Sequence, residues 1–210
     1  MAYARAVSVD PEDTSGAAYT ARLAAADARW WKRLLDVQAP YRRNLLRLRP
    51  GRTLDICCGI GRNLAALEPA IIGVDHNEHS VAVARGRGFT AFTPGEFAAS
   101  PQSKTLFESL LFAHVLEHMT YDAAETLVAT YLPYLEAGGT VIVITPQAAG
   151  FRSDPTHVVP FGFSEIDRTL RAVDLVPIRE QSFPFPRTVG RWFRYNEHVV
   201  VARRKGEAGR

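Results

Sequence analysis

The run FAHVLEHM, residues 112–119, contains two histidines and a glutamate directly after an apolar stretch. His114, Glu117 and His118 are spaced i, i+3 and i+4, so a helix would bring the three side chains to one face. Imidazole and carboxylate groups that converge in this way can bind a metal ion or remove a proton. They can equally be partly buried polar residues that satisfy nearby backbone groups. The cluster indicates a candidate site whose chemistry depends on its surroundings.

The letters HVLEH also match H-x-x-E-H, a zinc peptidase signature in which two helical histidines bind the metal and the glutamate activates water. This interpretation requires a helix through His114 and His118. It competes with the cofactor motifs described next, which place the cluster at the end of a buried strand.

A second group of residues is typical of a nucleotide-binding turn. The stretch TLDICCGIGRNL, residues 53–64, predicts a strand, a tight turn with Gly59 and Gly61, and the start of a helix. Glycines in such a turn let the backbone approach a ligand closely. Twenty residues after Asp55, Asp75 ends the next apolar run, where a carboxylate can accept both hydrogen bonds of a ribose diol. Together these residues predict a cofactor that contains adenosine.

Composition limits the class of protein. The 210 residues include 25 basic and 22 acidic side chains, and the balance of +3 falls short of the basic surface of a dedicated nucleic-acid binder. We therefore expect no nucleic-acid partner. The two cysteines, Cys57 and Cys58, are adjacent and offer neither an ordinary disulfide nor a CxxC metal pair, which fits the reducing cytoplasm. No stretch approaches the roughly 18 consecutive apolar residues of a membrane span, so we expect none.

The apolar pattern predicts a doubly wound α/β fold, because compact apolar runs alternate with helical segments. One helix is expected to run to Leu135, with Thr120 as its N-cap and Gly138-Gly139 ending it. The letters SEID, from Ser164, indicate a capping box at the start of a later helix. Helices are also expected over residues 23–37 and 41–48. The predicted strands are Thr53–Cys57, Ile71–Asp75, Leu106–Ala113, Thr140–Thr145, Val176–Phe183 and Glu197–Ala202.

The order of these motifs resembles the class I S-adenosylmethionine-dependent methyltransferases over about residues 50–175. Their first motif runs roughly D-x-G-x-G-x-G, and here Cys57 replaces its first glycine. The stretches GVDHNEHSVAVAR, PGEF, FESLLFAHVLEHM and LPYLEAGGTVIVITP resemble later motifs of the family in the same order. The resemblance implies a Rossmann-like, seven-stranded, mostly parallel sheet with helices on both faces and an antiparallel strand near 197–202.

The resemblance also implies that S-adenosylmethionine is the methyl donor. Asp75 would hold the ribose and His76 would flank the adenine. Glu96 would meet the adenine amine, and Phe97 would lie beside the ring. The chain would divide into an N-terminal helical lead-in or lid, residues 1–50, and a methyltransferase domain, residues 51–210. The implied cofactor-binding residues are Asp55, Cys57, Gly59, Gly61, Asn63, Asp75, His76, Glu96, Phe97 and Ala113.

FAHVLEHM further resembles a turn in methyltransferases that act on hydroxyl groups and bind a divalent ion. Quinone-biosynthesis enzymes and small-RNA 2'-O-methyltransferases carry E-x-x-E-H there, and the RNA enzymes add a histidine from the loop after strand five. His157 is in the corresponding loop here. The resemblance implies Glu117, His118 and His157 as metal ligands and His114, His118 and His157 as catalytic residues. His114 replaces the first glutamate, so it is either a fourth ligand or the general base.

The metal and the acceptor follow from the same resemblance. Family likeness favours magnesium or manganese, and an imidazole-rich ligand set favours manganese. The loop segment DPTHVVPF resembles one in methyltransferases of bacterial glycan synthesis, which implies a sugar or oligosaccharide acceptor and a role in polysaccharide biosynthesis. RNA 2'-O-methylation, methylation of a quinone or another small molecule, and non-catalytic cofactor binding are the alternatives. A homodimer is compatible with the sequence.

Overall fold

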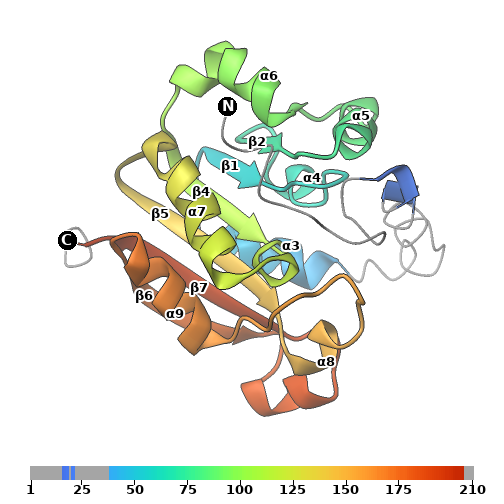
Figure 1. Cartoon of the computed structure of the whole chain (residues 1–210), viewed down its shortest axis with the longest axis vertical. Coiled ribbons are helices and arrows are strands. Elements are labelled where there is room, and N and C mark those ends of the chain that lie inside the picture. The colour runs from blue at the N-terminus through green and yellow to red at the C-terminus, as the bar shows by residue number, and fades with distance from the viewer. Residues whose placement is uncertain (1–15, 19, 22–37, 206–210) are drawn as a thin grey trace.

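The structure, a computed structural model, describes residues 16–18, 20–21 and 38–205 (Figure 1). The helix predicted over residues 23–37 lies outside these described residues. Among the described helices, none combines the length and the apolar character that crossing a bilayer requires.

One seven-stranded sheet forms the centre of the fold, in the order β3-β2-β1-β4-β5-β7-β6 (Figure 1). The strands are β1 Thr53–Ile56, β2 Ile71–Val74, β3 Ala91–Phe92, β4 Phe107–Ala113, β5 Leu135–Pro146, β6 Leu175–Phe183 and β7 Glu197–Arg204. Strands β1 to β5 pair in parallel, whereas β7 is antiparallel to β5 and β6. The predicted Rossmann-like sheet and its antiparallel insertion are confirmed.

Helices cover both faces of this sheet. Strand β4 shows why its apolar run is continuous: Leu110 and Phe112 enter one core, and Leu111 and Ala113 enter the other. The first core is shared with α6 Pro94–Ala99, α7 Tyr121–Tyr131 and α9 Phe163–Ala172, and the second with α3 Ala39–Arg47, α4 Leu64–Leu67 and α5 Glu78–Gly86. The remaining elements are α8 Ala148–Phe151 and 3₁₀ turns at Pro101–Lys104, Leu116–His118, Leu132–Tyr134 and Arg187–Arg191.

Two predicted helix boundaries are wrong by a few residues. Helix α7 begins as predicted, with the Thr120 hydroxyl accepting from the Ala123 N–H at 3.4 Å, but it ends at Tyr131. Pro133 lacks an N–H and disfavours helical geometry at the residue before it, so β5 begins at Leu135 and includes both glycines. Helix α9 begins at Phe163, where the Glu165 carboxylate accepts from the Gly162 N–H at 3.1 Å.

The strand register brings the candidate residues to one edge of the sheet. Ile56 at the end of β1 lies beside Val74 of β2 and Phe112 of β4. Because the three strands are parallel, the segments that follow them leave the sheet at the same edge. The glycine turn, Asp75 and His114 therefore belong to one region, which is where ligands bind in open α/β sheets.

The residue that departs from the family motif has strained backbone geometry. Cys57 has a φ of 60°, a left-handed conformation that costs a residue with a Cβ roughly 1–2 kcal/mol. This geometry explains why a glycine suits the position, because glycine adopts it without that cost.

We predict that Cys57→Gly raises the free energy of unfolding by about 1 kcal/mol, because it removes this strain. Urea denaturation measures the change. Cys57→Ala is the matched control, because it removes the thiol and keeps the Cβ. Equal effects of both variants would show that the backbone conformation is not the cause.

Candidate functional site

The Asp75 carboxylate organises the turn that follows β1. One of its oxygens accepts from the Gly59 N–H at 2.7 Å, and the other accepts from the Asn77 N–H at 2.8 Å. Asp75 is 5% exposed, and His76 Nδ1 lies 3.7 Å from Asp75 Oδ1. Each carboxylate oxygen has capacity for a further hydrogen bond, so Asp75 can hold the turn and accept ribose hydroxyls together.

Asp55 lies beneath the same turn as a buried carboxyl group with an unsatisfied oxygen. It is 1% exposed, its Oδ2 has no hydrogen-bond partner among the described residues, and Asn63 Nδ2 lies 3.5 Å from Oδ1. Burial, to which the charge of Asp75 adds, raises the pKa of Asp55 to about 8. A cationic or hydrogen-bond-donating ligand would satisfy this group.

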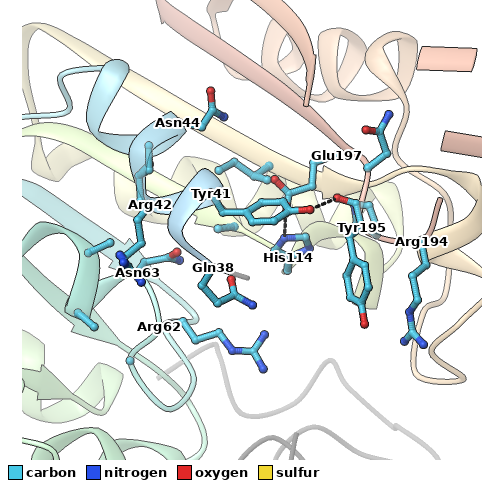
Figure 2. Close-up of a pocket in the computed structure, with 18 of the residues that line it drawn as sticks. Gln38, Tyr41, Arg42, Asn44, Arg62, Asn63, His114, Arg194, Tyr195 and Glu197 are labelled. Carbon is cyan, nitrogen blue, oxygen red and sulfur yellow. Dashed lines mark hydrogen bonds and ion pairs between the residues drawn. The ribbon is translucent and has the colours of Figure 1, made fainter. Parts of the chain in front are cut away.

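A pocket of about 760 Å³ lies beside the turn, within the size range of small-molecule and cofactor sites (Figure 2). The predicted residues Gly61, Asn63, Ala113 and His114 line it. A Cβ added to Gly61 would lie 2.6 Å from the Phe89 ring, so this part of the wall requires a glycine. The other lining residues are Gln38, Tyr41, Arg42, Asn44, Leu45, Arg62, Ala65, Ala66, Arg87, Phe89, Ile144, Pro146, Arg194, Tyr195, Asn196 and Glu197.

Three of the predicted residues, Glu117, His118 and His157, converge on one point. Each offers one ligand atom, and these atoms lie within 4.8 Å of one another. Glu117 is fully buried, and neither of its oxygens has a hydrogen-bond partner of good geometry among the described residues. Its nearest ring nitrogens are His114 Nδ1 at 3.4 Å and His157 Nε2 at 4.0 Å. A buried carboxylate without hydrogen bonds is costly unless a cation compensates its charge, so this donor set fits a metal ion.

Backbone carbonyl groups orient both imidazole rings. His118 Nδ1 lies 3.1 Å from the Thr156 carbonyl oxygen, and His157 Nδ1 lies 2.7 Å from that of Phe151. Carbonyl oxygens only accept, so each Nδ1 carries the hydrogen and each Nε2 keeps its lone pair. Burial also lowers the pKa of His118, which favours the neutral ring. Such carbonyl partners are typical of histidines that bind metals.

The loop that carries His157 is hydrogen-bonded to the turn after β4. The Val158 N–H donates to the Glu117 carbonyl oxygen at 2.7 Å. The His118 and His157 rings meet edge to face, with their centroids 4.8 Å apart. These contacts bring together residues that are almost forty positions apart in the sequence.

His114 is in a different position from the one predicted. Its φ of 56° is left-handed, so no helix runs from His114 into the 3₁₀ turn at Leu116–His118. The expected helical face therefore does not form. Its Nε2 lies 2.9 Å from Glu197 Oε1, and its Nδ1 faces Glu117. The zinc peptidase interpretation fails here, because His118 converges with His157 instead of His114.

The two carboxylates also determine the protonation of His114. Burial by itself would lower the pKa of this imidazole, but the nearby carboxylates of Glu117 and Glu197 outweigh burial and raise the pKa to about 10. Its Nδ1 faces Glu117 and its Nε2 faces Glu197, so these two carboxylates favour the protonated ring.

Glu96 and Phe97 have structural roles in the fold. The Glu96 carboxylate pairs with Arg85 at 2.8 Å and accepts from the Thr93 N–H at 2.7 Å, which closes the N-terminus of α6. Phe97 is 2% exposed and its ring packs against Phe92 and Tyr134. Contacts within the protein account for both side chains, and their adenine contacts stay a prediction.

Sequence reasoning missed the side of the pocket opposite the glycine turn. Tyr41 of α3 donates a hydrogen bond from its hydroxyl to the Tyr195 carbonyl oxygen at 2.7 Å, which ties α3 to the segment before β7. Glu197 begins β7 and binds His114 (Figure 2). The sequence signal for Glu197 was an acidic residue next to a buried strand, and this signal did not identify His114 as its partner. Burial, followed by the charge of Glu197, raises the pKa of the Tyr41 hydroxyl, which keeps it a donor.

Comparison with known proteins finds a family match in the central part of the chain. Residues 54–143 match the methyltransferase domain family. No curated protein is significantly similar to the chain in sequence. This methyltransferase domain match contains the glycine turn, Asp75 and the run from His114 to His118.

Solved structures show that the fold is that of class I methyltransferases. Magnesium protoporphyrin IX methyltransferase from Synechocystis, with bound S-adenosylhomocysteine, is 15% identical, with a TM-score of 0.64 over 91% of this chain and 96% of that one. A TehB-like S-adenosylmethionine-dependent methyltransferase from Corynebacterium glutamicum is 18% identical, with a TM-score of 0.61 over 90% and 100%. Mitomycin 7-O-methyltransferase is 19% identical, with a TM-score of 0.57 over 74% and 49%.

The methyltransferase domain family thus matches the central part of the chain, and the fold is that of the solved methyltransferases. His157, Arg194 and Glu197 lie outside residues 54–143. These residues come from the loop after β5 and from the segment that leads into β7.

Proposed function

We propose that this protein transfers a methyl group from S-adenosylmethionine to a hydroxyl group of a sugar, with the assistance of a divalent metal ion. The observation that carries the proposal is the buried Glu117 carboxylate, which has no hydrogen bond of good geometry and faces two oriented imidazoles. A hydroxyl is a weak nucleophile until its proton is removed, so a hydroxyl acceptor has the most use for such a site.

Cofactor binding is supported by the turn between β1 and α4. Gly59 and Gly61 have φ angles of 54° and 89°, which glycine adopts without strain, so they form the tight turn that such a cofactor site uses. Asp75 can accept the ribose hydroxyls at the end of β2. The unsatisfied Asp55 carboxyl is a suitable partner for the cofactor's ammonium group. These contacts would direct the sulfonium methyl group into the pocket lined by Ala113 and His114.

Glu117, His118 and His157 would hold the metal ion. One carboxylate and two imidazoles leave coordination positions open, and this donor set suits manganese better than magnesium. When bound, the ion would supply a positive charge that stabilises the deprotonated acceptor oxygen. His114 would hold one oxygen of Glu197 in place on the pocket wall. The other carboxylate oxygen would take the proton from the acceptor hydroxyl as the hydroxyl oxygen bonds to the methyl carbon and the carbon–sulfur bond breaks, which leaves S-adenosylhomocysteine.

A sugar acceptor is supported by sequence resemblance and by the walls of the pocket. The segment DPTHVVPF contains His157 and resembles the corresponding loop of glycan-modifying methyltransferases. Tyr41 and Tyr195 line the pocket and present aromatic faces and hydroxyls, which suit a ring that carries hydroxyl groups. Among sugars, the mannosides of the mycobacterial methylmannose polysaccharide are the first candidates, with 1-O-methylation as the reaction.

The predicted N-terminal lead-in also contributes residues to the pocket. Helix α3 belongs to the predicted lead-in, residues 1–50, and supplies Tyr41, Arg42, Asn44 and Leu45 to the pocket. Leu45 is 3% exposed and belongs to the core that α4 and α5 share. We infer that the lead-in forms part of the wall of the ligand pocket.

A methyl-transfer screen tests the proposal. Tritiated S-adenosylmethionine is supplied with mannosides, nucleosides, RNA oligomers and phenols, each with chelator and with manganese. We expect sugar hydroxyls to accept label only when manganese is present. Labelling of phenols or RNA alone would replace the sugar assignment, and labelling that is independent of metal would remove the metal.

A further inference from the structure

We propose that the acceptor carries an anionic group, a phosphate or a carboxylate, which Arg194 holds at the pocket wall opposite the glycine turn. The inference rests on the proposed function, because it describes the acceptor of that same reaction. It goes further by specifying a charge that neither the motif resemblance nor the fold predicts.

Several arginine side chains line the pocket. Its lining includes the guanidinium groups of Arg42, Arg62, Arg87 and Arg194. Among the described lining residues Glu197 is the one carboxylate, and His114 already pairs with it at 2.9 Å. Guanidinium groups present forked donors that match phosphate and carboxylate oxygens. An arginine on the pocket wall that no carboxylate neutralises would therefore favour an anionic ligand over a neutral one.

The arginines approach from two sides. Arg62 comes from the turn after β1 and Arg194 from the segment before β7, and Figure 2 shows them on opposite sides of the central His114. The Arg194 guanidinium lies 5.2 Å from the centroid of the Tyr195 ring, so the ring supports it from one side. No carboxylate in the described part of the chain pairs with Arg194.

The cofactor alone does not account for this charge. S-adenosylmethionine has a single carboxylate, and one bidentate guanidinium is enough to pair with it. Arg62 and Arg42 are next to the glycine turn and Asn63, on the cofactor side of the pocket (Figure 2). Arg194 is on the far wall with Tyr195 and Glu197. The charge that remains on that wall therefore faces the acceptor.

Calorimetry on enzyme saturated with S-adenosylhomocysteine tests the inference, because the cofactor's own carboxylate is then already bound. The probes are a hexose, its 6-phosphate and the corresponding uronic acid. We expect the phosphate or the uronate to bind at least roughly tenfold more tightly than the hexose, which corresponds to one charged hydrogen-bonded pair. The preferred probe distinguishes a phosphate from a carboxylate as the recognised group.

Arg194→Gln should reduce that preference by roughly tenfold, whereas Arg191→Gln should leave it unchanged. Both side chains are exposed and come from the same segment, but Arg191 does not line the pocket, so it controls for the loss of a surface charge. Equal affinity of the wild-type protein for charged and neutral sugars, no binding of either anion, or an unchanged preference in Arg194→Gln would each overturn the inference.

The same material separates this inference from the proposed function. Tritiated methyl transfer to the preferred probe is measured in parallel with its binding. Tight, Arg194-dependent binding without methyl transfer would leave the anion site in place and remove hydroxyl methylation of that sugar class. Methyl transfer with equal efficiency to charged and neutral sugars would support hydroxyl methylation and remove the anion site.

Discussion

Replacing Asp75 with alanine is expected to weaken S-adenosylmethionine binding by at least about 100-fold. The proposed ribose contacts are two hydrogen bonds to a carboxylate, each worth about 1.5–3 kcal/mol, so their loss costs at least about 3 kcal/mol. Asp75 also accepts from the backbone N–H groups of Gly59 and Asn77. The variant therefore loses part of the support of the glycine turn along with the ribose acceptor. Titration calorimetry measures the affinity directly.

Two controls make this result interpretable. Asp75→Asn keeps an acceptor oxygen for one backbone N–H, and thermal unfolding establishes whether either variant is folded at the temperature of the titration. Asp122→Ala removes an exposed carboxylate from the first turn of α7 and should leave the affinity unchanged. If folded Asp75→Ala binds S-adenosylmethionine within about threefold of the wild type, Asp75 does not hold the ribose.

Removing a proposed metal ligand should abolish manganese binding and reduce methyl transfer by at least about 100-fold, because a bound cation contributes several kcal/mol to charge stabilisation. His157→Ala is the preferred change, since it removes one imidazole and leaves the buried Glu117 in place. The electron paramagnetic resonance signal of free manganese reports binding without any need for activity. Cofactor affinity should stay at the wild-type value.

The matched control is His79→Ala, which removes an exposed histidine of α5 outside the cluster. Chelator treatment of the wild type should give the same loss of activity as His157→Ala, and added manganese should restore only the wild type. Wild-type affinity of His157→Ala for manganese would refute the ligand assignment. Full activity of an enzyme verified to be metal-free would show that methyl transfer does not need the ion.

Much of the fold could be predicted because its signals are local. The buried strand β4, the cap at Thr120 and the turn around Gly59 and Gly61 depend on residues within a few positions of one another. The boundary of α7 differs from the predicted one because Pro133 ends the helix at Tyr131, before the two glycines. The convergence of Glu117 with His118 was expected from spacing, but a 3₁₀ turn produces it instead of a helix.

The interactions that define the acceptor side could not be predicted in the same way. His114 and Glu197 are 83 residues apart, and nothing in either local segment specifies the other. His157 was predicted as a metal ligand from the family resemblance. Its contact with His118 depends on the loop between β5 and α9. Arg194 lies at the pocket because the segment between β6 and β7 brings the chain back to the sheet there.

The sequence by itself determined the alternating strands and helices, the glycine turn, and the acidic residues at the ends of β1 and β2, because short-range hydrogen bonding and burial specify them. Tertiary structure alone decided that His114 lies between two carboxylates and that four arginines surround one pocket. The physical reason is the insertion of β7 antiparallel between β5 and β6, which brings Glu197 beside Pro146 at the edge where the methyl donor is expected.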